Sequence, residues 1–554
     1  MARYLSSLML GTACLMSGAY SSAQSVDISQ LGEAQSYDTG PLDLANGGLD
    51  PSLWQGVSAE RAQLYISNID GTSLSELSST FFRRVILSAG VPPGGDADQV
   101  AAFDRARTTA QLKLGDRLAL ESLSNAQNPL QRDAVFRTQL ALSSGDSEAA
   151  CSEADREIDN RSAPFWMQMR IICHIIRDET AAAELTLNLL REQEDADPNF
   201  SDLADYVLGL RKAAPTDIPL GDPLLDTLRA LGTGDGTGDG GRAQSGTAFA
   251  ALALSEDASA DDRLAALFKA KDRLSTDQVT SILSSLLTSN LELAGNLELA
   301  GGTSFDIDTV LVGLQNEDKL TKSVAQAYNL AKDIDRIASA SQAVAALLNV
   351  SESVDYVPQM SRHLSDVMAF IPAARQAELD AERFAWAALR QGDISTLTSI
   401  YRELDEEDPL ASRIALAADA LGNGFVLGQL GVDIETRLDG AANVQKQAVR
   451  DSLIALALGA QLSDKAALSL NLVSDDKAER LNPLNLAEIN ALAKSGAYAG
   501  TLLKIVTSMG QREPKDLSNL EIYSYLSALS TAGLTREAGE LAAYDFLSRA
   551  PETE

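Results

Sequence analysis

The sequence is poor in histidine, the side chain on which many metal centres and catalytic triads depend. Its 554 residues include two, His174 and His363. Two histidines exclude a multi-histidine metal site, and a Ser-His-Asp triad would have to use one of them. His174 follows Cys173 within a predicted helix, and we interpret it as a partly buried residue with satisfied hydrogen bonds.

Other signatures of catalysis are also missing from the sequence. It contains no glycine-rich phosphate loop with its lysine and no dinucleotide-binding fingerprint. Carboxylate clusters such as residues 403–408 occur, but in a chain this acidic they indicate a charged turn rather than an acid/base pair. We therefore expect a protein that is not an enzyme and that binds no cofactor or metal.

Aromatic residues are scarce at 5% of the chain, and alternating runs typical of β-strands are hard to find. Alanine and leucine dominate instead, which favours an all-α fold. A chain of 554 residues exceeds the usual size of one compact core, so several domains or an elongated repeat array are expected.

Positive charge is in short supply, because 45 lysines and arginines face 78 aspartates and glutamates, a formal net charge of −33. Such a chain repels phosphate backbones, which excludes nucleic acid as the expected partner. We interpret the acidic surface as solvated helix faces. An acidic surface for cationic partners or loosely held divalent cations is the alternative.

Long hydrophobic runs are confined to the amino terminus. Arg3 is followed by the mostly apolar stretch Leu5–Ala19 and by small residues that place a cleavage site between Ala23 and Gln24. This pattern predicts a secretory signal peptide over residues 1–23 and a periplasmic protein. No later run reaches the roughly 18 apolar residues of a membrane-spanning helix, so we expect no transmembrane span in the mature chain.

The alternative for the amino terminus is a lipoprotein signal. Residues 11–14 end in Cys14, which would then carry an acyl chain and anchor the protein to the outer membrane. Gly11 stands where such signals usually carry leucine, so we favour cleavage after Ala23.

Cysteine is rare as well, and the mature chain would keep two, Cys151 and Cys173. They lie on predicted helices at similar distances from the loop at residues 159–163, so antiparallel packing would bring them to the same height. We predict a disulfide between them in an oxidising compartment. Two buried thiols are the alternative, and a redox-active pair is disfavoured because there is no C-x-x-C arrangement.

Around these cysteines the sequence is typical of packed helical hairpins. Pro164 suits a first helical turn, and Pro198 prevents a later helix from continuing. Between them, two apolar stripes at helical spacing are predicted to be buried: Phe165, Met169, Ile172, Cys173 and Ile176, then Ala182, Leu185, Leu189 and Leu190. Neither helix can bury its stripe alone, so each must pack on its neighbour.

Glycines recur at regular spacing in the carboxy-terminal part. Gly422, Gly459, Gly496 and Gly533 are each 37 residues apart. A period near this length, with glycine ending a helix at positive φ, predicts an α-solenoid. The Gly-Asp pair at residues 145–146 recurs at residues 392–393 with similar flanking residues. We therefore expect a right-handed α-solenoid of helical hairpins, similar to tetratricopeptide repeats.

The composition suggests five segments. They are a signal peptide at 1–23, an extended leader at 24–52, a helical array at 53–231, a Gly/Asp-rich linker at 232–246 and a second helical array at 247–554. Asp235 and Asp239 in the linker hint at a calcium loop, but their spacing matches neither an EF-hand nor glycine-rich calcium repeats. We interpret the segment as a flexible linker.

The hairpins resemble tetratricopeptide-like repeats, although Arg170 stands where the first helix would carry a small residue. More closely, several segments together look like a family of secreted helical-repeat proteins of Gram-negative bacteria: Leu53–Gly56, Leu87–Pro93, Cys151, Pro164–Trp166, Cys173 and Leu189–Gln193. The resemblance implies an exported helical-repeat protein and brings no catalytic residues.

These observations predict a non-enzymatic interaction scaffold or assembly factor of the cell envelope, which binds an envelope protein or peptide segment in a concave helical groove. Trp54 and Trp166 are possible interaction aromatics. Two alternatives are a helical domain of, or regulator for, a cell-wall hydrolase, and an outer-membrane-anchored structural lipoprotein.

Overall fold

The structure is a computed structural model. It describes residues 40–71, 73–125, 128–213, 215, 218, 221–232, 246–254, 258–292, 306–405, 408–422, 434–472 and 482–549. Throughout these residues the regular structure is helical, with no strand and two isolated β-bridges. The prediction of an all-α fold is therefore confirmed.

The first helices of the chain are α1 (Ala59–Ser67), α2 (Glu76–Leu87), α3 (Ala97–Leu114) and α4 (Arg117–Leu123). The next group consists of η1 (Pro129–Arg132), α5 (Ala134–Ser143), α6 (Ser147–Arg156), α7 (Pro164–Ile176), α8 (Thr180–Arg191), α9 (Pro198–Val207) and α10 (Pro223–Leu231).

The middle of the chain forms α11 (Gly246–Leu254), α12 (Ala260–Ala270), η2 (Lys271–Arg273), α13 (Thr276–Glu292), α14 (Ile307–Leu314), η3 (Glu317–Lys319), α15 (Leu320–Lys332), η4 (Ile334–Arg336), α16 (Ile337–Ser353), α17 (Val357–His363) and α18 (Ser365–Met368). The last part forms α19 (Ala373–Gln391), α20 (Ile394–Glu403), α21 (Pro409–Leu421), α23 (Ala442–Ala457), α24 (Asp464–Ser469), η5 (Leu470–Leu472), α25 (Pro483–Lys494), α26 (Tyr498–Met509), η7 (Pro514–Asp516), α27 (Asn519–Ala532) and α28 (Thr535–Ser548).

Helix ends follow local capping chemistry. The Gly-Asp pairs make the same turn twice: Gly145 and Gly392 have positive φ, and Asp146 and Asp393 accept hydrogen bonds from the first turns of α6 and α20. Of the four regularly spaced glycines, those at 459, 496 and 533 have positive φ, whereas Gly422 has a φ of −74°. The turn chemistry is therefore as the sequence indicates, except at Gly422.

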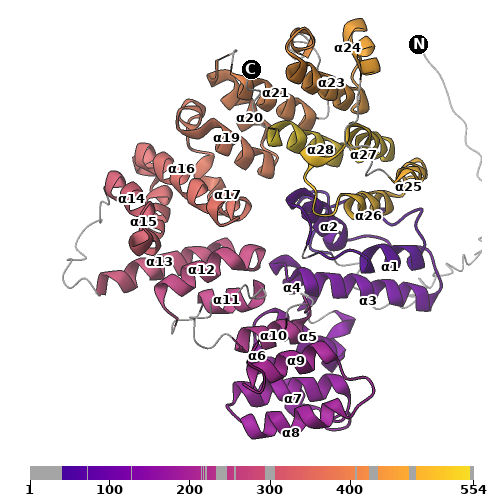
Figure 1. Cartoon of the computed structure of the whole chain (residues 1–554), viewed down its shortest axis with the longest axis vertical. Helices are drawn as coiled ribbons and strands as arrows, with labels where there is room; N and C mark the ends of the chain where they lie inside the picture. The colour runs from indigo at the N-terminus through magenta and orange to yellow at the C-terminus, as the bar shows by residue number, and fades with distance from the viewer. Residues whose placement is uncertain are drawn as a thin grey trace, which may run out of the picture.

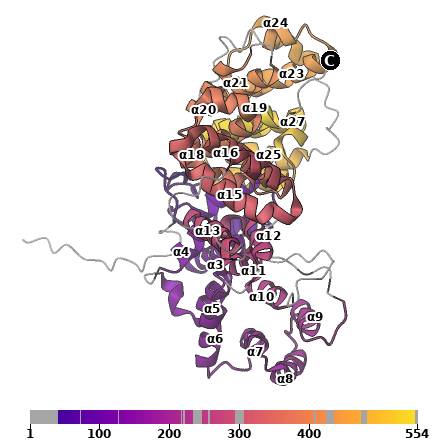
Figure 2. The same cartoon turned by 90° about the vertical axis from the view of Figure 1, so that its left-hand side faces the viewer.

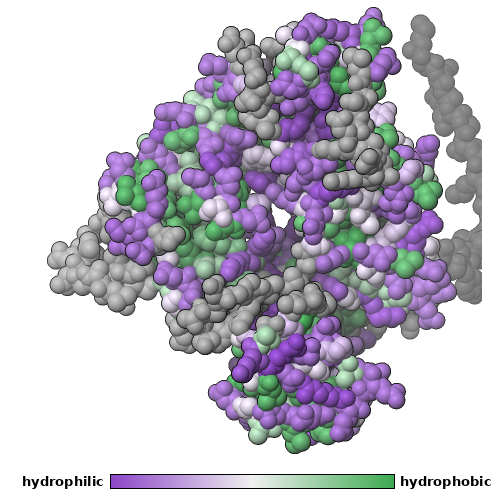
Figure 3. Space-filling view, viewed as in Figure 1, coloured by the Kyte–Doolittle hydropathy of each residue, from purple (hydrophilic) through white to green (hydrophobic). Residues whose placement is uncertain are grey.

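The helices follow one another around a closed ring (Figure 1). From α11 the chain runs round to α28, and α26 and α28 pack against α1 and α2 at the beginning of the chain. One continuous core contains buried residues from Leu42 to Ala119 together with buried residues from Phe249 to Leu547. The space-filling view shows an opening through the middle of the ring, surrounded by hydrophilic residues (Figure 3).

The helices α5 to α10 form a unit of their own beside the ring, and we call this unit the lobe. Its buried residues, from Leu142 to Leu228, make a separate core. It contacts the ring where α5 lies against α3 and where α10 lies against α11. In both Figure 1 and Figure 2, α8 lies at the end of the lobe farthest from the ring.

The described end of the predicted leader packs on the ring. Leu42 and Leu49 are buried, and Leu42 exchanges backbone hydrogen bonds with Leu87 at 3.2 Å and Ala89 at 3.0 Å. The predicted signal peptide, with Cys14, Ala23 and Gln24, lies outside the described residues. So does most of the predicted linker, including Asp235 and Asp239, and the domain boundaries stay a prediction. Among the described helices, a search for one both long and apolar enough to span a membrane finds none.

Candidate functional site

The last helix, α28, carries two carboxylates that meet the beginning of the chain. Arg84 on α2 donates hydrogen bonds to Glu537 at 2.6 Å and to Glu540 at 2.9 Å. The side chains of Arg84 and Glu537 are 6% and 5% exposed. Burial alone would lower the pKa of Arg84, but Glu540 and Glu537 outweigh it and the pKa is raised. The contact is therefore a buried ion pair that helps to close the ring.

A neighbouring contact joins three parts of the ring. Arg390 on α19 donates to Glu76 on α2 at 2.7 and 3.0 Å, and the hydroxyl of Tyr544 on α28 donates to the same carboxylate at 3.0 Å. Burial, followed by the charge of Glu76, raises the pKa of Tyr544 well above its usual value. Glu76 therefore ties α2 to both α19 and α28.

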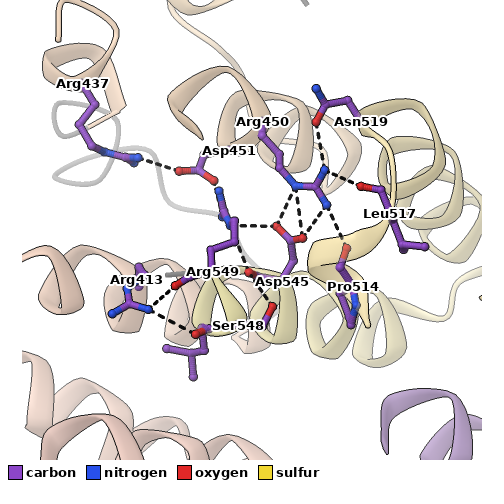
Figure 4. Close-up of polar contacts among 11 residues, drawn as sticks. Arg413, Arg437, Arg450, Asp451, Pro514, Leu517, Asn519, Asp545, Ser548 and Arg549 are labelled. Atoms are coloured by element: carbon purple, nitrogen blue, oxygen red, sulfur yellow. Dashed lines mark hydrogen bonds and ion pairs between the residues drawn. The ribbon is translucent and has the colours of Figure 1, made fainter. Parts of the chain in front are cut away.

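At its other end α28 is held by the arginines in Figure 4. Asp545 is fully buried and accepts from Arg450 on α23 at 2.7 Å, and Arg549 lies 3.3 Å from the same carboxylate. Asp451 accepts from Arg437 at 2.9 Å and from Arg549 at 2.5 Å. Each carboxylate thus lies between two arginines, an arrangement that holds α28 against α23.

Arg413 on α21 completes this cluster. It donates to the backbone carbonyls of Leu547 at 3.4 Å and Arg549 at 2.5 Å, where the last turn of α28 leaves carbonyl groups without helical partners. A cation at a helix carboxy terminus also interacts favourably with the helix dipole. These contacts position α28, and we assign this network a structural role.

Two further ion pairs influence one another, one within the segment α2–α4 and one in the middle of the chain. Arg83 on α2 pairs with Asp116 at the start of α4 at 2.5 Å. Arg362 on α17 pairs with Asp272 in η2, whose carboxylate also feels the charge of Arg83. Burial would raise the pKa of Asp272, but Arg362 above all outweighs it, and the pKa is lowered. These ion pairs are consistent with a structural role.

The two histidines lie in separate places. His363 is buried and lies 3.0 Å from Thr276 Oγ1 through Nδ1 and 3.2 Å from Tyr356 Oη through Nε2. Burial, helped by the charge of Arg362, lowers the pKa of His363 to about 4. His174 is 24% exposed and lies 2.6 Å from Glu179 through Nδ1, which agrees with its interpretation as a partly buried, satisfied residue.

Within the described part of the chain, no group of three or more histidine, cysteine, aspartate or glutamate side chains is placed to hold a metal ion. The two tryptophans proposed as interaction aromatics are both buried. Trp54 is 1% exposed and contacts Phe103 edge-on, and Trp166 is 4% exposed and contacts Phe165. Their burial speaks against a direct contact with a partner.

The predicted disulfide is confirmed. Cys151 on α6 is bonded to Cys173 on α7, with their Cα atoms 5.6 Å apart. The two helices pack against each other on either side of the loop at residues 159–163. The bond therefore lies inside the core of the lobe, and one of its cysteines is on α7, the helix that packs against α8.

The outer helix of the lobe, α8, differs from the prediction. Ala183, Leu187 and Leu190 face the core, whereas Leu185 and Leu189 are 63% and 49% exposed. The predicted stripe was wrong for these two leucines because α8 is apolar on two opposite sides, so the spacing of apolar residues does not reveal which side is buried. One of the two apolar sides faces the core of the lobe, and the other faces solvent.

We call this solvent-facing surface the α8 face and define it by Ala181, Leu185 and Leu189, which follow one another at four-residue intervals and are all exposed. Hydrophobic residues reach the surface of the lobe in Figure 3 as well. Ordinary turn and capping chemistry gives no reason for large apolar side chains at this place. Leu185 and Leu189 therefore form an exposed apolar pair on one side of α8.

The resemblance to a secreted helical-repeat family stays a prediction, because comparison with models of protein families, with curated proteins and with solved structures finds no match to this chain.

Proposed function

We propose that the protein is an exported, non-enzymatic interaction scaffold of the cell envelope. In this proposal the ring is a rigid platform, and the lobe presents α8 to a partner protein. The observation that carries the proposal is the exposure of Leu185 and Leu189 at the end of the lobe farthest from the ring. Exposed apolar side chains that follow one helix face are typical of a protein-binding surface.

Export is supported by two observations. The predicted signal peptide ends between Ala23 and Gln24, and the Cys151–Cys173 disulfide is of a kind that persists in oxidising compartments such as the periplasm. The succession of antiparallel hairpins, such as α7 with α8 and α15 with α16, supports the interpretation as a right-handed α-solenoid of tetratricopeptide-like units.

The ring's polar contacts support a scaffold rather than a catalyst. The buried carboxylates Glu537, Asp545 and Asp451 are each bound by arginine, so none is left as an acid or base for chemistry. These ion pairs fix the positions of distant segments of the chain relative to one another. A rigid platform lowers the conformational entropy that binding would cost.

The proposal is tested by crosslinking the tagged protein in intact cells and identifying the captured proteins by mass spectrometry. The wild type is compared with the double variant Leu185→Ser/Leu189→Ser and with a matched control, Leu468→Ser/Leu484→Ser, whose leucines are 69% and 79% exposed on the ring. We expect one stoichiometric envelope protein that is lost in the first variant and retained in the control.

The same sample reports on export. A mature chain that begins at Gln24 supports cleavage of the predicted signal peptide. An acylated Cys14 at the amino terminus would instead favour the lipoprotein. A partner that is captured equally by all three proteins would contradict the proposed role of the lobe.

A further inference from the structure

We infer that the α8 face binds an amphipathic helical segment of a partner protein, with apolar side chains on one side and lysine or arginine along its margins. The inference rests on the proposed function and adds the chemistry of the partner. Three observations support this partner: the geometry of the apolar row, the charges at the ends of the row and the net charge of the chain.

The apolar row fits the spacing of a second helix. Ala181, Leu185 and Leu189 span nine residues of α8, or about 12 Å, which corresponds to roughly two turns of a partner helix. The small side chain of Ala181 at one end lets a partner approach closely, while the two leucines supply apolar area. A row of this kind receives anchor residues at i, i+3 or i+4, and i+7 of an amphipathic helix.

The margins of the row are acidic. Asp178 lies in the turn before α8, and Glu192, Glu194 and Asp195 follow its carboxy terminus; all four side chains are exposed. Glu184 lies within the helix beside the row and is half-buried. Carboxylates at both ends of an apolar row complement cationic side chains that flank an apolar segment.

The arginines near α8 do not offset these carboxylates. Residues 177–197 contain two basic residues, and both are engaged in ion pairs: Arg177 with Asp155 at 2.6 Å, and Arg191 with Asp205. Each pair joins α8 or its preceding turn to another helix of the lobe. The exposed carboxylates around the row therefore keep their negative charge available to a partner.

Charge also argues against a second copy of this chain as the occupant. Two chains with a formal net charge of −33 each repel one another, and a symmetric contact through α8 would place the same acidic margins opposite themselves. A cationic segment is attracted by the same field. The negative charge of the chain therefore favours a positively charged partner segment.

The test measures binding of two fluorescein-labelled helix-forming peptides of about 14 residues to the full, oxidised chain by fluorescence anisotropy. Both peptides carry leucine on one side, and the other side carries lysine in one peptide and glutamate in its matched control. We expect the leucine/lysine peptide to bind and the leucine/glutamate peptide to show no binding.

Variants separate the α8 face from general attraction between unlike charges. Leu185→Ser/Leu189→Ser is expected to weaken binding of the lysine peptide by at least about tenfold, whereas Leu468→Ser/Leu484→Ser leaves it unchanged. Glu192→Gln/Glu194→Gln/Asp195→Asn is expected to weaken it severalfold in low salt and less in about 300 mM salt. Equal binding to all variants, or equal binding of both peptides, would overturn the inference.

Sedimentation of the chain without peptide tests the other occupant. A dimer that disappears in Leu185→Ser/Leu189→Ser would assign the α8 face to a second copy and overturn the inference. The proposed function fails separately: it falls if the captured partner persists in cells when both leucines are replaced. If that partner is lost but neither peptide binds, the scaffold stands and the inferred partner chemistry falls.

Discussion

Individual buried side chains give the most direct tests of the ring. His363 is enclosed with Thr276, Tyr356 and Arg362, and its pKa is lowered to about 4. The folded state therefore disfavours the protonated ring. Neutral His363 makes its full contribution to the free energy of unfolding above pH 6.5, the approximate pKa of histidine in the unfolded chain. This contribution is lost as the pH falls from about 6.5 through 4.

We expect His363 to reduce the free energy of unfolding by about 2 kcal/mol between pH 7.5 and pH 5. Urea-induced unfolding at both pH values measures it as the difference between the wild type and His363→Gln. His174→Gln, which replaces a partly exposed histidine, serves as the matched control. An identical pH dependence of the wild type and His363→Gln would show that the histidine is not held neutral.

Gly539 tests the close approach of α28 to α21. A Cβ atom at this position would lie 2.4 Å from the backbone oxygen of Ala420, so the two helices would have to separate. Gly539→Ala is expected to destabilise the chain by about 1–3 kcal/mol, although alanine favours helix more than glycine does.

Gly94 provides the control for this substitution, because a Cβ atom there meets nothing within 4 Å and its φ is not positive. Gly94→Ala is expected to change the free energy of unfolding by less than about 0.5 kcal/mol. Thermal unfolding of both variants measures the difference. A Gly539→Ala protein as stable as Gly94→Ala would contradict the packing of α28 on α21.

At this scale the sequence predicted what depends on neighbours in the chain. Cys151 and Cys173 could be paired because both flank one short loop, and Asp146 and Asp393 cap the helices after the two Gly-Asp turns. Leu185 was assigned to the wrong side of its helix. A helix with two apolar sides carries no local information about which one the tertiary structure covers.

The helix α28 supplies the buried ion pairs that help to close the ring. Arg84 reaches it from α2, more than 450 residues earlier in the chain, and its charge is buried with those of Glu537 and Glu540. Removing one member of a buried ion pair leaves the other charge without compensation. Removing one partner of this contact is therefore expected to lower the free energy of unfolding strongly.

Arg84→Ala is expected to destabilise the chain by about 3–5 kcal/mol because Glu537 would stay buried and unpaired. The matched control is Arg117→Ala, which removes an exposed pair with Glu121 within α4 and should cost about 0.5 kcal/mol or less. Chemical denaturation measures both. Similar losses in the two variants would show that the link between α2 and α28 contributes no more than a surface pair.

Helix positions could be predicted because their caps are local, as the Gly-Asp turns before α6 and α20 illustrate. The residues that α28 contacts could not be predicted from the sequence. Asp545 binds Arg450, and Glu537 binds Arg84, across separations that leave no periodic signal in the sequence. The same limit explains why Trp54 and Trp166, which the sequence allowed as interaction aromatics, are buried in the structure.

The described residues form two main packed units, the ring and the lobe, and a smaller cluster of Leu112, Leu123, Phe136 and Leu140 lies where they join. The sequence suggested a division into consecutive arrays, and it did not indicate that α1 and α2 pack against α26 and α28. A closed ring requires pairing of α2 with α26, and such non-local contacts depend on the complete three-dimensional arrangement.

Reduction of the disulfide should affect the lobe alone. The bond closes a loop between positions 22 residues apart, so its loss should cost the lobe about 3 kcal/mol. Hydrogen exchange is expected to become faster in α6, α7 and α8 after reduction and to stay unchanged in α15, α16 and α28. Faster exchange throughout the ring as well would show that the two units do not respond separately.

A photoreactive amino acid at position 188, exposed on α8 beside Leu189, tests whether the lobe presents α8 to a partner protein. It is compared in intact cells with the same group at position 484 on the ring. We expect a single discrete adduct from position 188 that disappears when Leu185 is replaced by serine, and none from position 484. Absence of an adduct at 188, or the same adducts from both positions, would show that the lobe does not present α8 to a partner.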